Sequence, residues 1–305
     1  IIFLPYIHAI SKKFQSKVSL LVKKSSKAEE LCADDEYVGE IINLDINKNN
    51  SGRHKGLMGF FRLVKEIKEK KFDKVFIFNG SLRFFFLAKL VGIKSINQYP
   101  LFIRKDNIVL TAKKFTEKFT EADVPVQPNL FLSQHKIDKA KNKYKFDNNL
   151  KHICIGFSAS GPTKRWSVEN YIKLAENINK SRPCKFYLAG GQNDEELFKK
   201  FLSSSLTNNC ISFKDLSISE TLPIIKNCDI YIGNDTGWLH IASALGKKCV
   251  ALFMDSPVQA YGKYSKNTSV IIPEGETEQT TTHKTLGKNK ISFEKVLNKS
   301  LEILN

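Results

Sequence analysis

Short apolar segments alternate with amphipathic helical segments along nearly the whole 305-residue chain. In "SVENYIKLAENINK" (167–180) apolar residues recur every three or four positions, which is typical of a helix, whereas "HICIGF" (152–157) is a compact apolar run typical of a buried strand. Strands that are separated by helices pair in parallel, and their apolar character requires helices on both faces of the sheet. The alternation therefore predicts an α/β fold.

The alternation occurs in both halves of the chain, on either side of a less regular segment. That segment, 120–152, holds two prolines, a charged helical stretch and a polar "DNN". We therefore expect two doubly wound, Rossmann-like domains facing a cleft, with domains 1–148 and 149–305. The predicted strands are 18–22, 40–44 and 74–78, then 152–157, 185–190, 210–213, 230–233 and 248–253; the predicted helices are 56–70 and 81–92, then 167–180, 194–205, 218–227 and 237–246.

The net charge of +17 is concentrated in the first half of the chain. Residues 1–150 hold 28 Lys and Arg against 16 Asp and Glu, a net of +12, and residues 151–305 hold 20 against 15, a net of +5. This excess indicates an acidic partner or, equally, a lysine-biased composition, since 42 of the 48 basic residues are Lys. No zinc spacing, basic helix or aromatic-interleaved basic motif supports nucleic acid as that partner.

Cysteine usage and hydropathy bear on the compartment. The six cysteines form no C-x-x-C pair and lie mostly in apolar strand segments, so we expect reduced core residues and a cytoplasmic chain. No apolar run reaches the roughly 18 to 20 residues that a membrane-spanning helix needs. The initial "IIFLPYIHAISKKF" is also too short an apolar segment to predict a signal peptide.

Ligands of doubly wound sheets bind at the carboxyl ends of the strands, which selects three loops of the second half. In "GNDTG" (233–237), glycines allow close approach of the backbone, and Thr236 and the first N–H groups of a helix can donate to a diphosphate. His240 follows on the same helix face. The alternatives are an ordinary helix cap, with Asp235 or Thr236 as the N-cap, and a packed core histidine.

The other two loops carry further polar groups. In "SASGPTKRW" (158–166), the side chains of Ser158, Ser160, Thr163 and Lys164 can surround the same phosphates; the alternative is a solvated loop with Trp166 in the core. In "GGQNDEE" (190–196), Glu195 or Glu196 can accept from both hydroxyls of a ribose, or can simply favour the first turn of a helix. There is no P-loop, no G-x-S-x-G motif and no metal-ligand spacing, so we expect neither a metal nor a cofactor.

Two of these loops resemble sequence blocks of a known family. "GNDTGWLHIASALGKKCVALF" (233–253) resembles the D-[ST]-G-x-x-H-[IL]-A-x-A-L-G-x-P-x-V-A-L-F block of the family-nine glycosyltransferases, the bacterial heptosyltransferases of lipopolysaccharide core assembly. "IGFSASGPTKRWSVENYIKLAENI" (155–178) resembles the family's G-A-S-x-x-x-K-x-W-P block, in the same order and separation. Weaker similarity extends over nearly the whole chain.

The resemblance implies a GT-B fold and an inverting transfer of heptose from an ADP-linked donor to an acidic glycolipid of the lipopolysaccharide core type. It implies that Thr236, Gly237 and His240 hold the donor diphosphate and that Asp235 orients the turn. Lys164 would reach the phosphate and ribose and stabilise the leaving group; Glu195, rather than Glu196, would bind the ribose; Ser158 and Thr163 would line the same site. The implied location is the cytoplasm, at the inner face of the inner membrane, with peripheral contact to anionic lipid.

The sequence also departs from the family pattern. Trp238 and Lys248 replace prolines, which changes loop stiffness more than chemistry. Family members place an Asp base in a Gly-Asp turn before an apolar segment like "IIFLP", so this base is expected one or two residues upstream of Ile1, and transfer is impaired if the chain lacks it. Alternatives are a non-catalytic nucleotide-sugar or anionic-glycan binding protein of the same fold, or a GT-B epimerase.

Overall fold

The computed structural model describes residues 1–46, 51–99 and 108–305, which form two compact units. One unit comprises residues 6–124, and the other comprises residues 1–5 and 125–305. The division falls at Val124 and Pro125, inside the irregular segment but before the boundary expected at 148/149. The reason is that the charged helix α6 (Gln134–Lys143) packs against α9 (Ile218–Asn227) and so belongs to the second unit.

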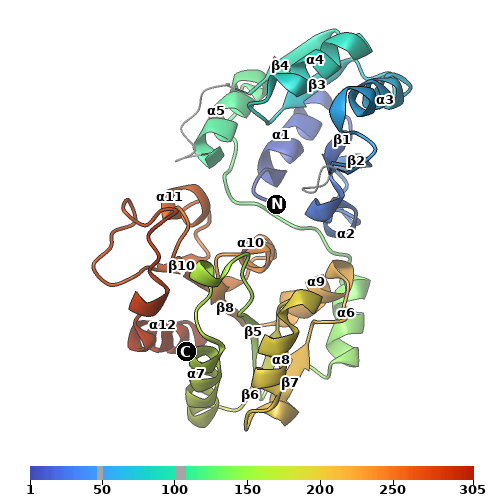
Figure 1. Ribbon diagram of the computed structural model, residues 1–305. Helices are drawn as coiled ribbons and strands as arrows, with labels where there is room; N and C mark the ends of the chain where they lie inside the picture. The colour runs from blue at the N-terminus through green and yellow to red at the C-terminus, as the bar shows by residue number, and fades with distance from the viewer. Residues whose placement is uncertain (47–50, 100–107) are drawn as a thin grey trace. The chain divides into compact units, whose positions relative to one another are not determined.

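The second unit contains one six-stranded parallel sheet in the order β10-β9-β8-β5-β6-β7 (Figure 1). This is the doubly wound order, in which the first strand of the unit, β5, lies beside the fourth, β8. The strands are β5 (Lys151–Gly156), β6 (Cys184–Leu188), β7 (Cys210–Ser212), β8 (Ile230–Asn234), β9 (Lys248–Leu252) and β10 (Thr268–Ile271).

Helices cover both faces of this sheet, as its apolar strands require. On one face, α7 (Val168–Ser181), α8 (Glu195–Leu202) and α12 (Phe293–Leu304) share a buried core with the sheet. A second group, α9 and α10 (Gly237–Ala244), lies on the other side, and α10 contacts β8 and β9. A short helix, α11 (Val258–Tyr261), follows β9.

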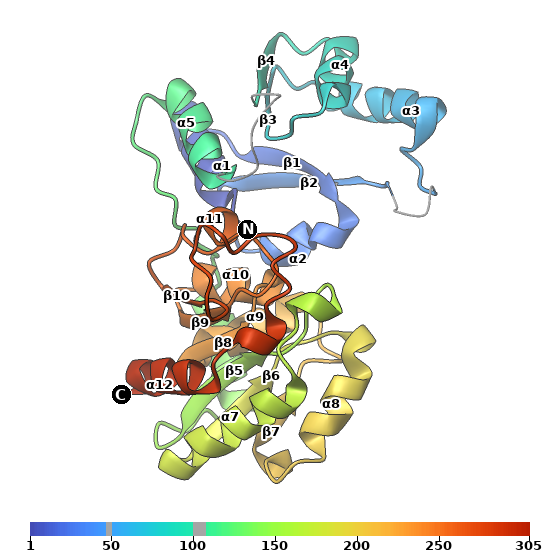
Figure 2. The same ribbon diagram turned by 60° about the vertical axis from the view of Figure 1, so that its left-hand side comes forward.

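The first unit holds two parallel strand pairs rather than one continuous sheet (Figure 2). The strands are β1 (Val18–Lys23) with β2 (Val38–Leu44), and β3 (Lys74–Ile77) with β4 (Ser95–Gln98). One apolar cluster joins both pairs to α3 (Gly56–Lys68) and α4 (Leu82–Val91). An aromatic cluster built on Phe76 and Phe78 packs with α5 (Ile108–Thr120), while α1 (Leu4–Phe14) and the short α2 (Ala28–Leu31) complete the unit.

The predicted α/β fold is therefore confirmed, and each predicted strand and helix is present within a few residues of its expected bounds. The sequence did not predict β4, β10 or the helices α1, α2, α5, α11 and α12. All six cysteines are free thiols, and three of those in strands or beside them, Cys154, Cys228 and Cys249, have pKa values raised by burial. None of the helices in the described ranges has the length and apolar character needed to cross a membrane.

Candidate functional site

The carboxyl ends of β5 and β8 lie side by side at the point where the strand order of the sheet reverses. Gly156 and Gly233 are paired there in register. A Cβ atom added to Gly156 would lie 1.9 Å from the hydroxyl of buried Tyr231, and one added to Gly233 would lie 2.6 Å from the Gly156 carbonyl oxygen. Only glycine fits both positions, and the two polar loops leave the sheet directly beyond them.

Asn234, the last residue of β8, joins these two loops. Its buried side chain accepts hydrogen bonds from the backbone N–H of Trp166 (3.2 Å) and the hydroxyl of Tyr171 (2.9 Å). Its amide nitrogen donates to the carbonyl oxygens of Phe157 (2.9 Å) and Ser158 (3.2 Å). One side chain therefore fixes both ends of the loop that carries Lys164.

The helix α10 begins at this point without a side-chain cap. Thr236 occupies the N-cap position in an extended conformation, yet its side chain accepts no hydrogen bond from the first turn of the helix. Its buried hydroxyl makes no hydrogen bond of normal geometry with the described residues, although the Tyr231 hydroxyl lies close enough to interact with it. Thr236 is therefore the N-cap residue by position, as the alternative interpretation stated, but its side chain makes no capping hydrogen bond. The N–H groups of this turn are available to an anion.

Open space lies beside Gly237, the first residue of α10. A Cβ atom added to Gly237 would meet nothing within 4 Å. The Gly237 backbone is accordingly accessible to a ligand, as the sequence interpretation requires.

His240 lies one turn into α10, between Asp235 and Tyr264. Its Nδ1 hydrogen-bonds the Tyr264 hydroxyl, and its Nε2 lies 3.6 Å from Asp235 Oδ1. Burial lowers the pKa of the imidazole, and the Asp235 carboxylate opposes this shift. His240 is therefore a half-buried and oriented group whose neutral form is favoured, rather than an exposed cation.

The loop after β5 carries Thr163 and Lys164 in a short 3₁₀ turn, Pro162–Lys164. The Thr163 hydroxyl donates to Asp255 Oδ2 (2.7 Å), so it is already engaged. The Lys164 ammonium makes no hydrogen bond or ion pair with any residue in the described ranges, although its charge helps to lower the pKa of the Asp255 carboxyl. Lys164 is therefore the cation of this loop that is available for a ligand.

Asp255, which the sequence interpretation missed, anchors that loop to a distant segment. Its Oδ1 accepts from the backbone N–H groups of Lys284 (2.7 Å) and Leu286 (3.2 Å). Burial by itself raises the pKa of this carboxyl, but the Thr163 hydroxyl, the two N–H groups and the Lys164 charge outweigh burial and hold the pKa below its ordinary value. Its position just after β9, at the carboxyl end of a parallel strand, is the sequence signal that points to it.

The loop after β6 is held by Asp194 rather than by the glutamates that follow it. Asp194 Oδ2 accepts from the Gly191 N–H (3.0 Å), and its Oδ1 lies 3.5 Å from Arg165 Nη2. Glu195 forms an ion pair with Lys214 (3.1 Å), which lowers the pKa of the glutamate, and Glu196 pairs with Lys199 (3.3 Å). The structure thus leaves Glu195 near the strand ends but partnered, and Glu196 on the exposed side of α8.

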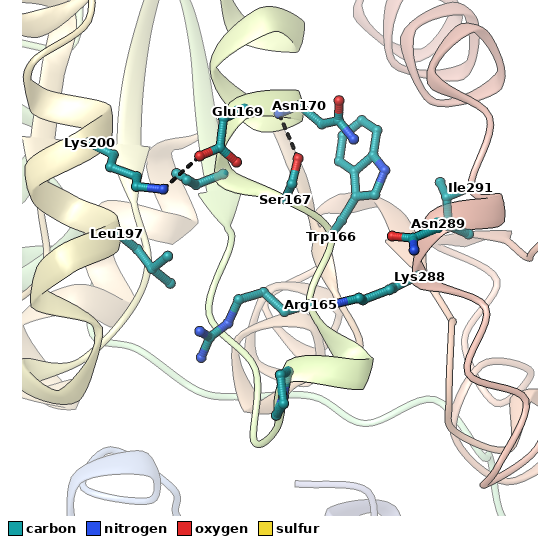
Figure 3. Close-up of a pocket in the computed structure, with 12 residues that line it drawn as sticks. Arg165, Trp166, Ser167, Glu169, Asn170, Leu197, Lys200, Lys288, Asn289 and Ile291 are labelled. Atoms are coloured by element: carbon teal, nitrogen blue, oxygen red, sulfur yellow. Dashed lines mark hydrogen bonds and ion pairs between the residues drawn. The ribbon is translucent and has the colours of Figure 1, made fainter.

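A groove of about 440 Å³ opens beside the loop, between α7, α8 and the segment 288–291 (Figure 3). Arg165, Lys200 and Lys288 line it together with one acid, Glu169, which is paired with Lys200 (2.7 Å). Trp166 borders the groove but is itself buried, edge-on to the Tyr171 ring at 5.0 Å between centroids. Trp166 therefore packs in the core, as its alternative interpretation stated.

The site thus consists of loops held by internal hydrogen bonds around two groups that are free to bind an anion. These are the N–H groups at the start of α10 and the Lys164 ammonium. Around the ends of β5, β8 and β9 the structure brings together Thr163, Lys164, Asp235, Thr236, Gly237 and His240. The Ser158 hydroxyl makes no hydrogen bond with the described residues, and only the Ser158 carbonyl oxygen is engaged, by Asn234. Within the described ranges no three or more His, Cys, Asp or Glu side chains gather as a metal site. The arrangement suits a diphosphate bound by helix N–H groups and one lysine.

Sequence comparisons agree with this arrangement. A model of glycosyltransferase family 9 (heptosyltransferase) matches residues 60–291. The lipooligosaccharide heptosyltransferase 2 of Haemophilus influenzae is 26% identical over 244 residues, which are 71% of this chain and 70% of that protein.

Solved structures with low sequence identity share the fold. A family 9 glycosyl transferase from Veillonella parvula is similar with a TM-score of 0.79 and 17% identity, over 99% of this chain and 92% of that one. The Escherichia coli heptosyltransferase WaaC, solved with ADP, is similar with a TM-score of 0.71 and 14% identity, over 98% and 95% of the two chains. The expected similarity to GT-B heptosyltransferases is confirmed.

Proposed function

Because this chain belongs to glycosyltransferase family 9, the heptosyltransferase family, we propose that it transfers a heptose from an ADP-linked donor to an acidic glycolipid of the lipopolysaccharide core type. WaaC, similar in fold, has been solved with ADP and with ADP-2-deoxy-2-fluoro heptose, which supports the choice of donor. Two features at the ends of the paired strands β5 and β8 carry the proposal: the start of α10 has no side-chain cap, and the Lys164 ammonium has no partner among the described residues.

The proposed reaction breaks the bond between the anomeric carbon and the β-phosphate oxygen. The acceptor hydroxyl oxygen forms the new bond with inversion and gives up its proton to a general base, a role that we assign to no residue of this chain. Negative charge then develops on the departing ADP. Donors that are already fixed in place stabilise such charge without reorganising during the reaction. We assign this role to the N–H groups at Gly237, the Thr236 hydroxyl and the Lys164 ammonium.

The remaining site residues position these groups. Asp255 holds the Thr163 hydroxyl, and Asn234 holds both ends of the loop that carries Lys164. Asp235 and Tyr264 orient His240 for the diphosphate. The ion pair of Glu195 with Lys214 uses one carboxylate oxygen, and we assign the other oxygen to the ribose hydroxyls. The acceptor is an acidic glycolipid, so we place the reaction at the inner face of the cytoplasmic membrane.

Calorimetry with ADP tests the donor site. Lys164→Ala and Thr236→Val each remove one hydrogen bond to the diphosphate, worth about 1 to 3 kcal/mol, so each should weaken ADP binding roughly 5- to 150-fold. Lys180→Ala, at the far end of α7, is the matched control and should bind as the wild type does. Wild-type affinity in both site variants would reject the site.

Turnover separates an enzyme from a binding protein of the same fold. The chain should release ADP from ADP-heptose only when a core-type glycolipid that lacks heptose is present. ADP binding without any such release, under conditions where an active family member turns over, would favour the non-catalytic alternative.

A further inference from the structure

The exposed apolar side chains of this chain are concentrated on two adjacent helices of the first unit. Nine large hydrophobic residues in the described ranges are exposed, and six of them lie on α3 and α4, with exposed fractions from 50% to 80%. Isolated exposed leucines are ordinary, but a cluster of this kind marks an interaction surface. The six, called here the α3/α4 face, are Leu57, Met58, Phe61, Leu82, Phe86 and Leu90.

Helical spacing places the apolar residues on one side of each helix, and the two helices are in contact. Leu82, Phe86 and Leu90 follow one another at intervals of four, so they form a stripe along α4. The starts of the two helices touch, because Arg83 lies over the Phe60 ring (5.6 Å to its centroid) and hydrogen-bonds the His54 carbonyl oxygen. In Figures 1 and 2 the two helices lie next to each other.

The opposite sides of both helices are buried in the core of the unit. Leu63 and Ile67 of α3, and Leu87 and Val91 of α4, pack into the apolar cluster over the strand pairs. The outer residues therefore contribute nothing to that core. Their apolar character is unexplained by folding of the unit.

Basic residues alternate with the apolar ones on the same surface. Arg62 and Lys65 follow Met58 and Phe61 by one helical turn, and Lys89 precedes Leu90. Within α3 three cations (Arg62, Lys65 and Lys68) accompany one acid, Glu66, which pairs with Arg53 and His54; α4 has two cations, Arg83 and Lys89, and no acid. A second copy of the chain would bring this positive surface against itself. An anionic bilayer offers the complementary charge together with an apolar interior.

We propose that the α3/α4 face docks on an anionic lipid bilayer, with its apolar side chains at the level of the headgroups and the flanking Lys and Arg on the phosphates. Helices with Phe and Leu on one side and Lys and Arg beside them bind membranes in this orientation. The inference rests in part on the proposed function, since a glycolipid acceptor resides in such a bilayer. It assigns the membrane contact to a defined surface that the donor site does not include.

Flotation of the full chain with vesicles tests the docking face. The vesicles are phosphatidylcholine with or without phosphatidylglycerol, and they contain neither acceptor nor nucleotide. The wild type should float with the anionic vesicles. Phe61→Glu with Phe86→Glu should weaken binding roughly tenfold or more, because each aromatic side chain is lost from an apolar environment. Leu110→Glu, an equally apolar exposed position on α5, should change binding by about twofold at most.

Several outcomes would overturn the proposal. These are no binding of the wild type to anionic vesicles, equal binding by the double variant, or equal loss in the Leu110→Glu control. A concentration-dependent dimer in sedimentation velocity that the double variant abolishes would identify a second copy as the occupant instead. ADP affinity should be unchanged in the double variant. If the wild type binds vesicles but not ADP, the proposed function fails while the docking face stands.

Discussion

Asn234 shows how much one buried amide determines at this site. Its amide nitrogen faces two carbonyl oxygens, so Asn234→Asp would place a carboxylate oxygen against them in a site that water does not reach. We expect the free energy of unfolding to fall by about 2 to 5 kcal/mol, together with weaker ADP binding. Urea unfolding of the variant measures this, with the surface substitution Asn177→Asp as the control. A stability equal to that of the control would contradict the role of Asn234.

Asp255 gives a prediction about pH. Its pKa is lower in the folded chain than its ordinary value near 4, so its contribution to stability is complete above about pH 4 and is lost as pH falls through the lower, folded pKa. Asp255→Asn keeps an acceptor for the Lys284 and Leu286 N–H groups but removes the charge. The variant should be less stable by about 1.5 to 3 kcal/mol at neutral pH.

The comparison of Asp255 with its variant isolates this carboxyl, because all other titrating groups are shared. Urea unfolding of both chains from pH 6 to pH 3 should give a constant difference in unfolding free energy above about pH 4 that shrinks below it. A difference that stays constant or grows on acidification would show that the Asp255 carboxylate is not the stabilising species.

These side chains also mark the limit of inference from sequence. The types of residue in the loops predicted where an anion could bind, and the structure gathers those loops. The sequence does not reveal that the Thr163 hydroxyl donates a hydrogen bond to Asp255, 92 residues away. Nor does it reveal that the Asn234 side chain accepts one from the Trp166 N–H, 68 residues away. Partners so distant along the chain leave no local pattern, so free and engaged hydroxyl groups look alike.

Among the elements, the fully buried strands were all predicted, and so were some half-buried strands, such as β1 and the short β7. The long apolar runs of β5, β6, β8 and β9 are buried on both faces and were predicted. Two strands were missed, β4 ("SINQ") and β10 ("TSVI"); each has four half-buried residues at the edge of its sheet. A short strand at an edge needs little apolar surface, so its sequence resembles that of a loop.

The start of α10 also gives a prediction about metal. The acids nearest the proposed diphosphate are already engaged, Asp255 by Thr163 and two N–H groups, and Asp235 by the neighbouring His240. If the helix end and Lys164 supply the positive potential, replacing magnesium with EDTA should change the Kd for ADP by roughly twofold at most, or ~0.4 kcal/mol. Calorimetry in the two buffers measures this. A tenfold loss on chelation would assign the diphosphate to a cation instead.

The division of the whole chain into two units, each with its own core, predicts how ADP binding stabilises it. A ligand at 100 times its Kd stabilises the folded form that binds it by about 2.7 kcal/mol, or a factor of about 100. Amides of β5 and β8 that exchange only when the second unit unfolds should therefore exchange about 100-fold more slowly with ADP. Amides of β1 and β3 belong to the other unit and should exchange at unchanged rates if the units unfold separately.

Hydrogen exchange read by mass spectrometry distinguishes the strands in one experiment. Lys164→Ala at the same ADP concentration is the control and should show a smaller slowing in β5 and β8, because less of the site is occupied. Equal slowing in β1 and β3 would show that the two units unfold as one. If amide exchange slowed only in β1 and β3, ADP would be bound to the first unit. A bound ligand slows exchange in the unit that must stay folded to hold it.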